Sequence, residues 1–208
     1  VDACGGTRAA CDCNRARSPQ YAKPMPRDKR RGSWRWLGKR VRVLDRLFGR
    51  KDDAAALYRA VVDRAREEHW YTTGGVVDTI DGRFDAIAAV ISLVLLRIER
   101  AAGSEALGVA LAERFVDDMD PQLREIGIGD IVVGKHIGRM MSMLGGRLGA
   151  YRAGLAGGSL DAALVRNLYR DRVPADDALA HVRGELTRFA AALDATPVDA
   201  LAAGRLPR

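Results

Sequence analysis

The segment from residue 84 to residue 100 constrains the fold of this chain more than any other stretch. If this segment forms a helix, large apolar side chains lie on nearly all of its faces, which is typical of a helix buried in the centre of a domain. Its β-branched residues would also suit a strand. The length, and the ending at Arg97 and Arg100, favour a helix. We therefore expect a buried central helix here.

Apolar residues at steps of three and four positions continue through most of residues 53–204. They predict helices over roughly 54–69, from Ser104 to Met119, from Asp130 to about residue 155, from Ser159 to Leu168, and over 175–194. No convincing two-residue alternation bounded by hairpin turns is present. The sequence predicts an all-α fold, with a single globular multi-helix domain of about seven helices.

Two prolines indicate where shorter elements begin. Asp120-Pro121 has the pattern of an N-cap followed by proline in the first helical position, and Gly127 would end that short turn. Thr196-Pro197 opens a last short helix in the same way, and Gly204 would close it.

Charge separates the first quarter of the chain from the rest. Residues 1–52 carry 15 Lys/Arg and 5 Asp/Glu, whereas residues 53–208 carry 19 Lys/Arg and 22 Asp/Glu. The net charge of +7 therefore comes from the N-terminal segment. Such an excess favours contact with nucleic acid or an anionic membrane, but only through this arm. We expect no specific DNA binding.

Residues 1–33 show no hydrophobic period and are predicted to form a disordered leader. Two interpretations stay open for it: a native arm, or an artefact of the choice of start site, with Met25 or Val43 as alternative starts. All three cysteines lie in the first 13 residues, and their C-x6-C-x-C spacing lacks the paired knuckles of a structural zinc site.

Residues 34–50 differ from the leader because apolar residues recur on one helical face, with basic residues round the remainder. A basic amphipathic helix with tryptophans at one end suits a membrane interface or an acidic partner groove. An ordinary helix docked on the body by its apolar stripe is the alternative. The candidate contact residues are Trp34, Trp36, Arg40, Arg42 and Arg46.

The sequence offers little support for catalysis. Residues 129–135 match G-x-x-x-x-G-K, but His136 stands where a phosphate loop has Ser or Thr, and a helical turn precedes the motif instead of a strand. The better interpretation is the entrance of a helix. The histidines lack metal-site spacing, and no serine has the context of a nucleophile. We expect no enzymatic activity, no metal and no cofactor.

One block combines turn residues and charges within this helical pattern. Its parts are Trp70-Tyr71, residues 78–85 (DTIDGRFD), Asp118-Met119-Asp120, residues 123–130 (LREIGIGD) and Gly134-Lys135. In this order the block resembles the ubiquinol–cytochrome c chaperone family over about residues 54–172. Val77 stands where the family usually has proline, and Ile80 and Ile126 are apolar replacements.

The resemblance implies an assembly factor for the ubiquinol–cytochrome c oxidoreductase. It implies a non-enzymatic chaperone that binds newly made cytochrome b, or another subunit of that complex, at or near the membrane. The expected location is the cytoplasm, peripheral to the inner membrane, in a bacterium, or the mitochondrial matrix side in a eukaryote. The alternative is a ribosome- or RNA-associated factor that acts through the basic arm.

Two interpretations also stay open for the charges of the block. They either form internal salt bridges and caps, or they form a charged rim beside an apolar groove that receives a segment of cytochrome b. The candidate client-binding residues are Trp70, Tyr71, Asp78, Asp81, Arg83, Asp85, Asp118, Asp120, Arg124, Glu125, Asp130 and Lys135.

Overall fold

The structure is a computed structural model that describes residues 54–124 and 133–207, with the backbone alone for 120–124 and 133–139. Within these ranges it contains eight α-helices and no strand, which confirms the all-α prediction. The helices are α1 (Ala55–Ala65), α2 (His69–Thr72), α3 (Ile80–Glu99), α4 (Glu105–Arg124), α5 (Val133–Leu155), α6 (Leu160–Asn167), α7 (Asp176–Ala195) and α8 (Val198–Ala202).

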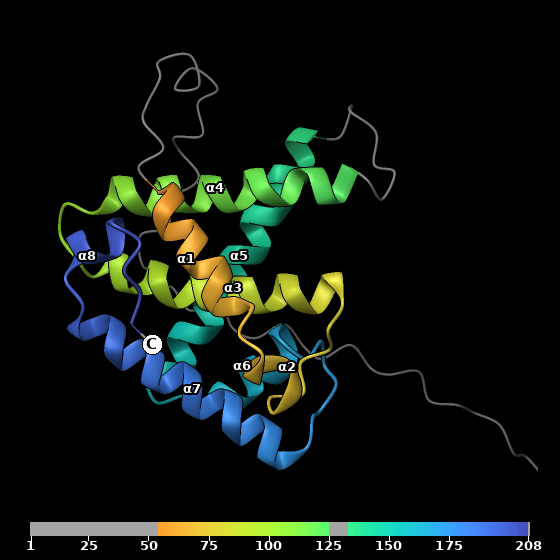
Figure 1. Cartoon of the computed structure of the whole chain (residues 1–208). Helices are drawn as coiled ribbons and strands as arrows, with labels where there is room; N and C mark the ends of the chain where they lie inside the picture. Colours follow the sequence, from red (N-terminus) through yellow and green to blue (C-terminus); the bar gives the residue numbers. More distant parts are fainter. Residues whose placement is uncertain (1–53, 125–132, 208) are drawn as a thin grey trace, which may run out of the picture. The chain divides into compact units, whose positions relative to one another are not determined.

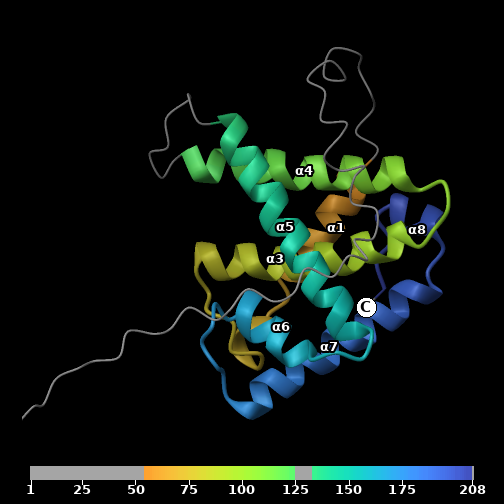
Figure 2. The ribbon, with the colours of Figure 1, turned by 180° about the vertical axis from the view of Figure 1, so that it is seen from behind.

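Helix α3 is the central element of this bundle. It lies between α4 and α7 in Figure 1, where α1 crosses one side of it, and Figure 2 shows α5 crossing the opposite side. Every side chain from Ala86 to Leu96 is buried. Full burial of each large aliphatic side chain contributes roughly 1.5–3 kcal/mol, so α3 supplies much of the apolar core.

Helix α3 begins four residues earlier than the sequence pattern predicts. Thr79 has extended backbone geometry, and its hydroxyl accepts a hydrogen bond from the Gly82 amide at 3.1 Å, as an N-cap residue does. A Cβ on Gly82 would lie 1.9 Å from the Val77 carbonyl oxygen. Glycine at that position therefore lets the preceding loop fold tightly against the first turn.

Helix α4 corrects the predicted break at Asp120-Pro121, because it runs without interruption to Arg124. The fixed φ of proline is compatible with a helix, but inside a helix proline loses one backbone hydrogen bond and its ring crowds the carbonyl of the preceding turn, at a cost of about 3 kcal/mol or more. The stripe formed by Leu111, Phe115 and Met119 is buried and keeps α4 on α3 up to this point. The predicted stop at Gly127 and the cap at Asp130 lie outside the described residues.

The C-terminal half follows the predicted pattern more closely. Ser159 caps α6, since its hydroxyl accepts from the Ala162 amide at 3.1 Å. The short helix α2 was not predicted. Each described helix is too short or too polar to cross a lipid bilayer. The leader (1–33) and the basic segment (34–50) lie outside the described residues, so their predictions, and the domain limits of 53–204, stay predictions.

Candidate functional site: the N-terminal end of α3

The loop before α3 and its first turn carry a two-point ion pair. Arg83 Nε donates to Asp78 Oδ1 at 2.6 Å, and Arg83 Nη2 donates to Asp78 Oδ2 at 3.1 Å. These hydrogen bonds from Arg83 lower the pKa of the Asp78 carboxyl. Both side chains are more than half exposed. The pair thus orients charges at the surface and adds little to stability.

Asp85, one turn further along α3, is fully buried and holds two arginines from other elements. Arg147 Nη2 on α5 donates to Oδ1 at 2.6 Å, and Arg170 Nε, in the connection after α6, donates to Oδ2 at 2.5 Å. Burial raises the pKa of Asp85, and the two arginines act in the opposite direction. A buried carboxylate requires such partners, so Asp85 ties α3, α5 and the α6–α7 connection together.

Arg170 joins the buried carboxylate to the surface. Its Nη1 donates to Asp81 Oδ2 at 2.6 Å, in the first turn of α3. Arg170 and Asp171 adopt φ values of 55° and 61°, in the left-handed region that L-residues rarely occupy. This conformation costs roughly 1–2 kcal/mol per residue, so the contacts of Arg170 with the two aspartates hold a strained turn in place.

Exposed apolar side chains accompany these charges. Among the described residues, the large apolar side chains that are exposed are Val77, Ile80, Met143 and Val173. Three of these four lie on the loop before α3, on its first turn, or three residues after Arg170. We call this surface the α3 entrance. It consists of Val77, Asp78, Ile80, Asp81, Arg83, Arg170 and Val173.

Trp70 and Tyr71, which the sequence placed among the candidate contacts, fasten α2 to the end of α1. The indole Nε1 of Trp70 donates to the Arg64 carbonyl at 2.8 Å, and the Tyr71 hydroxyl donates to the Ala65 carbonyl at 2.9 Å. Trp70 is only 3% exposed. Trp70, like Asp85, is buried and therefore does not form part of the surface of the α3 entrance.

Asp118 connects α4 to α1. Its Oδ2 accepts a hydrogen bond of 2.7 Å from the Tyr58 hydroxyl. Burial, and then the hydrogen bond with Asp118, raise the pKa of Tyr58. The structure thus gives Asp118 a partner inside the bundle.

The comparison with known families settles what kind of protein this is. The family model described as Ubiquinol-cytochrome C chaperone matches residues 72–207. The chain belongs to the ubiquinol–cytochrome c chaperone family. The match extends through α7 and α8, beyond residues 54–172, to which the motifs alone had pointed.

A solved structure agrees with this assignment to the ubiquinol–cytochrome c chaperone family. The chain is similar to the crystal structure of the Cbp3 homolog from Brucella abortus, with a TM-score of 0.66 and 32% sequence identity. The similarity covers 75% of this chain and 90% of that one. No curated protein matches the chain.

The second half of the motif block that resembles the chaperone family is not placed by the structure. The side chains of Asp120, Arg124, Glu125, Asp130 and Lys135 lie outside those described, as do Trp34, Trp36, Arg40, Arg42 and Arg46. Whether the two charged turns lie together therefore stays a prediction. In the described parts of the chain, no group of three or more His, Cys, Asp or Glu side chains could hold a metal ion.

Sequence reasoning missed the two arginines that bind Asp85. Arg147 follows the buried Leu144 by three positions and precedes the buried Tyr151 by four, so its place beside the apolar stripe of α5 was a usable signal. Arg170 stands in an irregular connection and carries no local pattern. Only the fold reveals that it meets α3.

Proposed function

We propose that this protein is a non-enzymatic assembly chaperone that binds newly made cytochrome b, and that the α3 entrance is part of its client-binding surface. The family supports a role in assembly of the ubiquinol–cytochrome c oxidoreductase. The observation that supports this surface is that two exposed apolar side chains, Val77 and Ile80, stand beside the paired charges at the start of the most buried helix.

The chemistry of the α3 entrance suits a segment of an unassembled membrane-protein subunit. Val77, Ile80 and Val173 offer apolar contact, while the Asp78–Arg83 and Asp81–Arg170 pairs provide a polar border whose charges are already balanced. Interfaces commonly combine an apolar centre with a polar rim. An apolar client segment could be held there without an unpaired charge being buried beneath it.

The proposed place of action is the membrane surface where cytochrome b is inserted. The basic segment 34–50 supports this part of the proposal through its sequence, since Trp34, Trp36 and the neighbouring arginines suit an anionic interface. Binding of the protein to anionic vesicles, absent with neutral vesicles and weakened by salt, is the expected result.

Client capture from membranes of cells that make the ubiquinol–cytochrome c oxidoreductase tests the proposal. The full chain should retain cytochrome b, and Arg83→Glu should lose it while helical content and melting temperature stay unchanged. The matched control is Arg183→Glu, because Arg183 is an exposed arginine of α7 that pairs with Asp161 of α6 and not with a residue of the α3 entrance. Equal capture of cytochrome b by the two variants would show that the α3 entrance does not bind the client. Recovery of ribosomal proteins alone would overturn the proposal that cytochrome b is the client and would favour the ribosome-associated alternative.

A further inference from the structure

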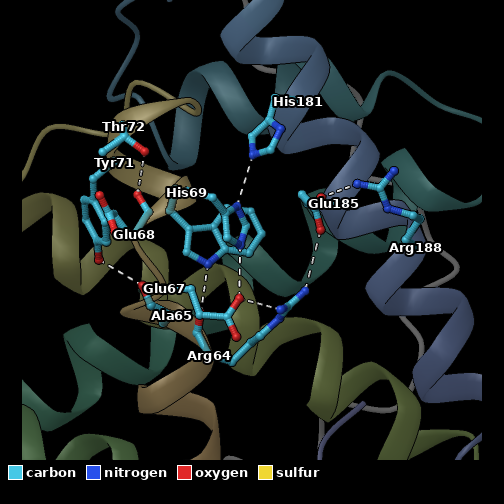
Figure 3. Close-up of polar contacts among 11 residues, drawn as sticks. Arg64, Ala65, Glu67, Glu68, His69, Tyr71, Thr72, His181, Glu185 and Arg188 are labelled. Carbon is cyan, nitrogen blue, oxygen red and sulfur yellow. Dashed lines mark hydrogen bonds and ion pairs between the residues drawn. The ribbon is translucent and has the colours of Figure 1, made fainter. Parts of the chain in front are cut away.

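Helices α2 and α7 meet through two histidines that lie 112 positions apart in the chain. His69 Nδ1 lies 3.0 Å from His181 Nε2, and the two rings are edge to face (Figure 3). On its other side, His69 Nε2 lies 3.0 Å from a carboxylate oxygen of Glu67. His69 is therefore held at both ring nitrogens.

The proton positions follow from what each partner can do. A carboxylate only accepts, so Nε2 of His69 carries a proton. Nδ1 of the neutral His69 ring then accepts from Nε2–H of His181. One further proton, on either ring, preserves the bond, because one imidazolium can donate to one neutral imidazole. If a second proton is added, both facing nitrogens carry an N–H group and neither can accept a hydrogen bond. The hydrogen bond between the rings is then lost, and the two positively charged rings repel each other.

The surrounding charges do not offset a second imidazolium. Glu67 already accepts from Arg64 Nη1 at 2.5 Å, and Glu185 is paired with Arg188 and lies 3.7 Å from Arg64 Nη2 (Figure 3). The two carboxylates are thus balanced by two arginines. The charged groups that hydrogen bonds and ion pairs link to the histidine pair come from the α1–α2 connection (Glu67), from α1 (Arg64) and, through Arg64, from α7 (Glu185, Arg188).

We propose that His69 and His181 form an acid-sensitive clip, which holds α2 against α7 until both imidazoles are protonated and then releases it. Protonation changes which imidazole nitrogens can accept a hydrogen bond, so acid is the stimulus that would open the clip. Its release would loosen α2 and the loop that leads from α2 to α3. The clip is a property of the fold and does not depend on which client the protein binds.

Hydrogen exchange in the full-length protein tests the clip directly. The amides of Gly74 and Val76 report on α2, since they donate to the carbonyls of His69 and Trp70 at 2.8 and 3.1 Å. Their protection, corrected for intrinsic exchange, should fall about tenfold when the solution is acidified from neutral pH until both rings are charged, the effect expected from losing one hydrogen bond. The protection of amides in the middle of α3 should not change with this acidification. Constant protection of Gly74 and Val76 would overturn the proposal.

Two variants separate the clip from general acid effects. His181→Gln supplies an amide that can donate to or accept from His69, so the contact survives in both charge states and protection should no longer depend on pH. The matched control His136→Gln removes the remaining histidine and should behave as the unmodified protein. An unchanged acid response in His181→Gln, or its loss in His136→Gln, would contradict the clip.

A measurement on the unmodified protein keeps the test decisive if His181→Gln does not fold. Nitrogen NMR of the imidazole rings, recorded when both rings are neutral, should find the proton of His69 on Nε2 and a proton on Nε2 of His181. A proton on Nδ1 of neutral His69 would overturn the proposed arrangement.

Discussion

Arg170 reaches the buried carboxylate of Asp85 across 85 positions of sequence, with Nε 2.5 Å from Oδ2. The same guanidinium also binds Asp81 in the first turn of α3. Through these bonds the irregular connection after α6 is attached to the start of the central helix. The α3 entrance therefore has a rigid support, although two of its three segments are not helical.

The two arginines that bind Asp85 should differ in their contributions to stability. Arg147 is 14% exposed and Arg170 is 47% exposed, so water can replace Arg170 more readily than Arg147. We expect Arg147→Leu to lower the free energy of unfolding by about 3 kcal/mol or more, as removal of one partner of a buried pair does. Arg170→Leu should cost roughly half as much. Urea unfolding measures both, and equal costs, or the reverse order, would contradict the burial argument.

The Tyr58–Asp118 hydrogen bond should link α1 to α4. Tyr58→Phe removes the donor and is expected to cost about 1 kcal/mol. A double-mutant cycle with Asp118→Ala, which removes the acceptor, gives the coupling energy between the two side chains, which should be similar in size. Tyr71→Phe is the matched control, because its hydroxyl bonds to the Ala65 carbonyl and not to Asp118. Its cost should be additive with that of Asp118→Ala.

Local sequence patterns predicted most of the helices, but they did not predict the long-range ion pairs that support the α3 entrance. The buried α3 and the amphipathic helices that cover it follow from helical spacing, since each pattern spans only a few turns of sequence. The bonds of Asp85 join residues 62 and 85 positions apart. Such contacts depend on how helices pack, and no local spacing specifies that.

The histidines and the motif charges also show that local sequence does not specify contacts between distant helices. The sequence shows only Glu67 and Glu68 beside His69, and only the packing of α7 against α2 brings His181 to it. The motif block correctly indicated the family, because a run of turns and charges is specific even without coordinates. Its client-binding role stays a prediction, since internal ion pairs account for several of the same charges.

Alkaline pH should weaken the fold through its buried tyrosines. Burial raises the pKa of Tyr169 to about 12, and burial also raises the pKa of Tyr58 and of Tyr151. In the unfolded chain these phenols titrate near pH 10. Their stabilisation is thus complete below about pH 10 and is lost as the pH rises towards 12, at about 1.4 kcal/mol per pH unit for each tyrosine. Urea unfolding followed between pH 8 and pH 11 should show this decline.

Tyr151→Phe provides the control for the alkaline decline. Among the described residues, the buried Tyr151 hydroxyl has no hydrogen-bond partner. Its removal should therefore leave the free energy of unfolding at neutral pH unchanged or slightly higher. The decline above pH 10 should become shallower by about one third, because one of three buried phenols is gone. An unchanged slope would show that Tyr151 does not contribute.

Two glycines near the α2–α7 contact should respond in opposite ways to the same substitution. A Cβ on Gly74 would lie 2.5 Å from the Trp70 carbonyl oxygen and 2.7 Å from Val182 Cγ2, whereas a Cβ on Gly184, within α7, would meet no atom within 4 Å. Gly74→Ala should destabilise the protein by about 1–3 kcal/mol, as overpacking does. Gly184→Ala should stabilise it by up to about 1 kcal/mol, the helix preference of alanine over glycine. Thermal and urea unfolding of the two variants measure both signs, and stabilisation by Gly74→Ala would show that the loop after α2 is not held against α7.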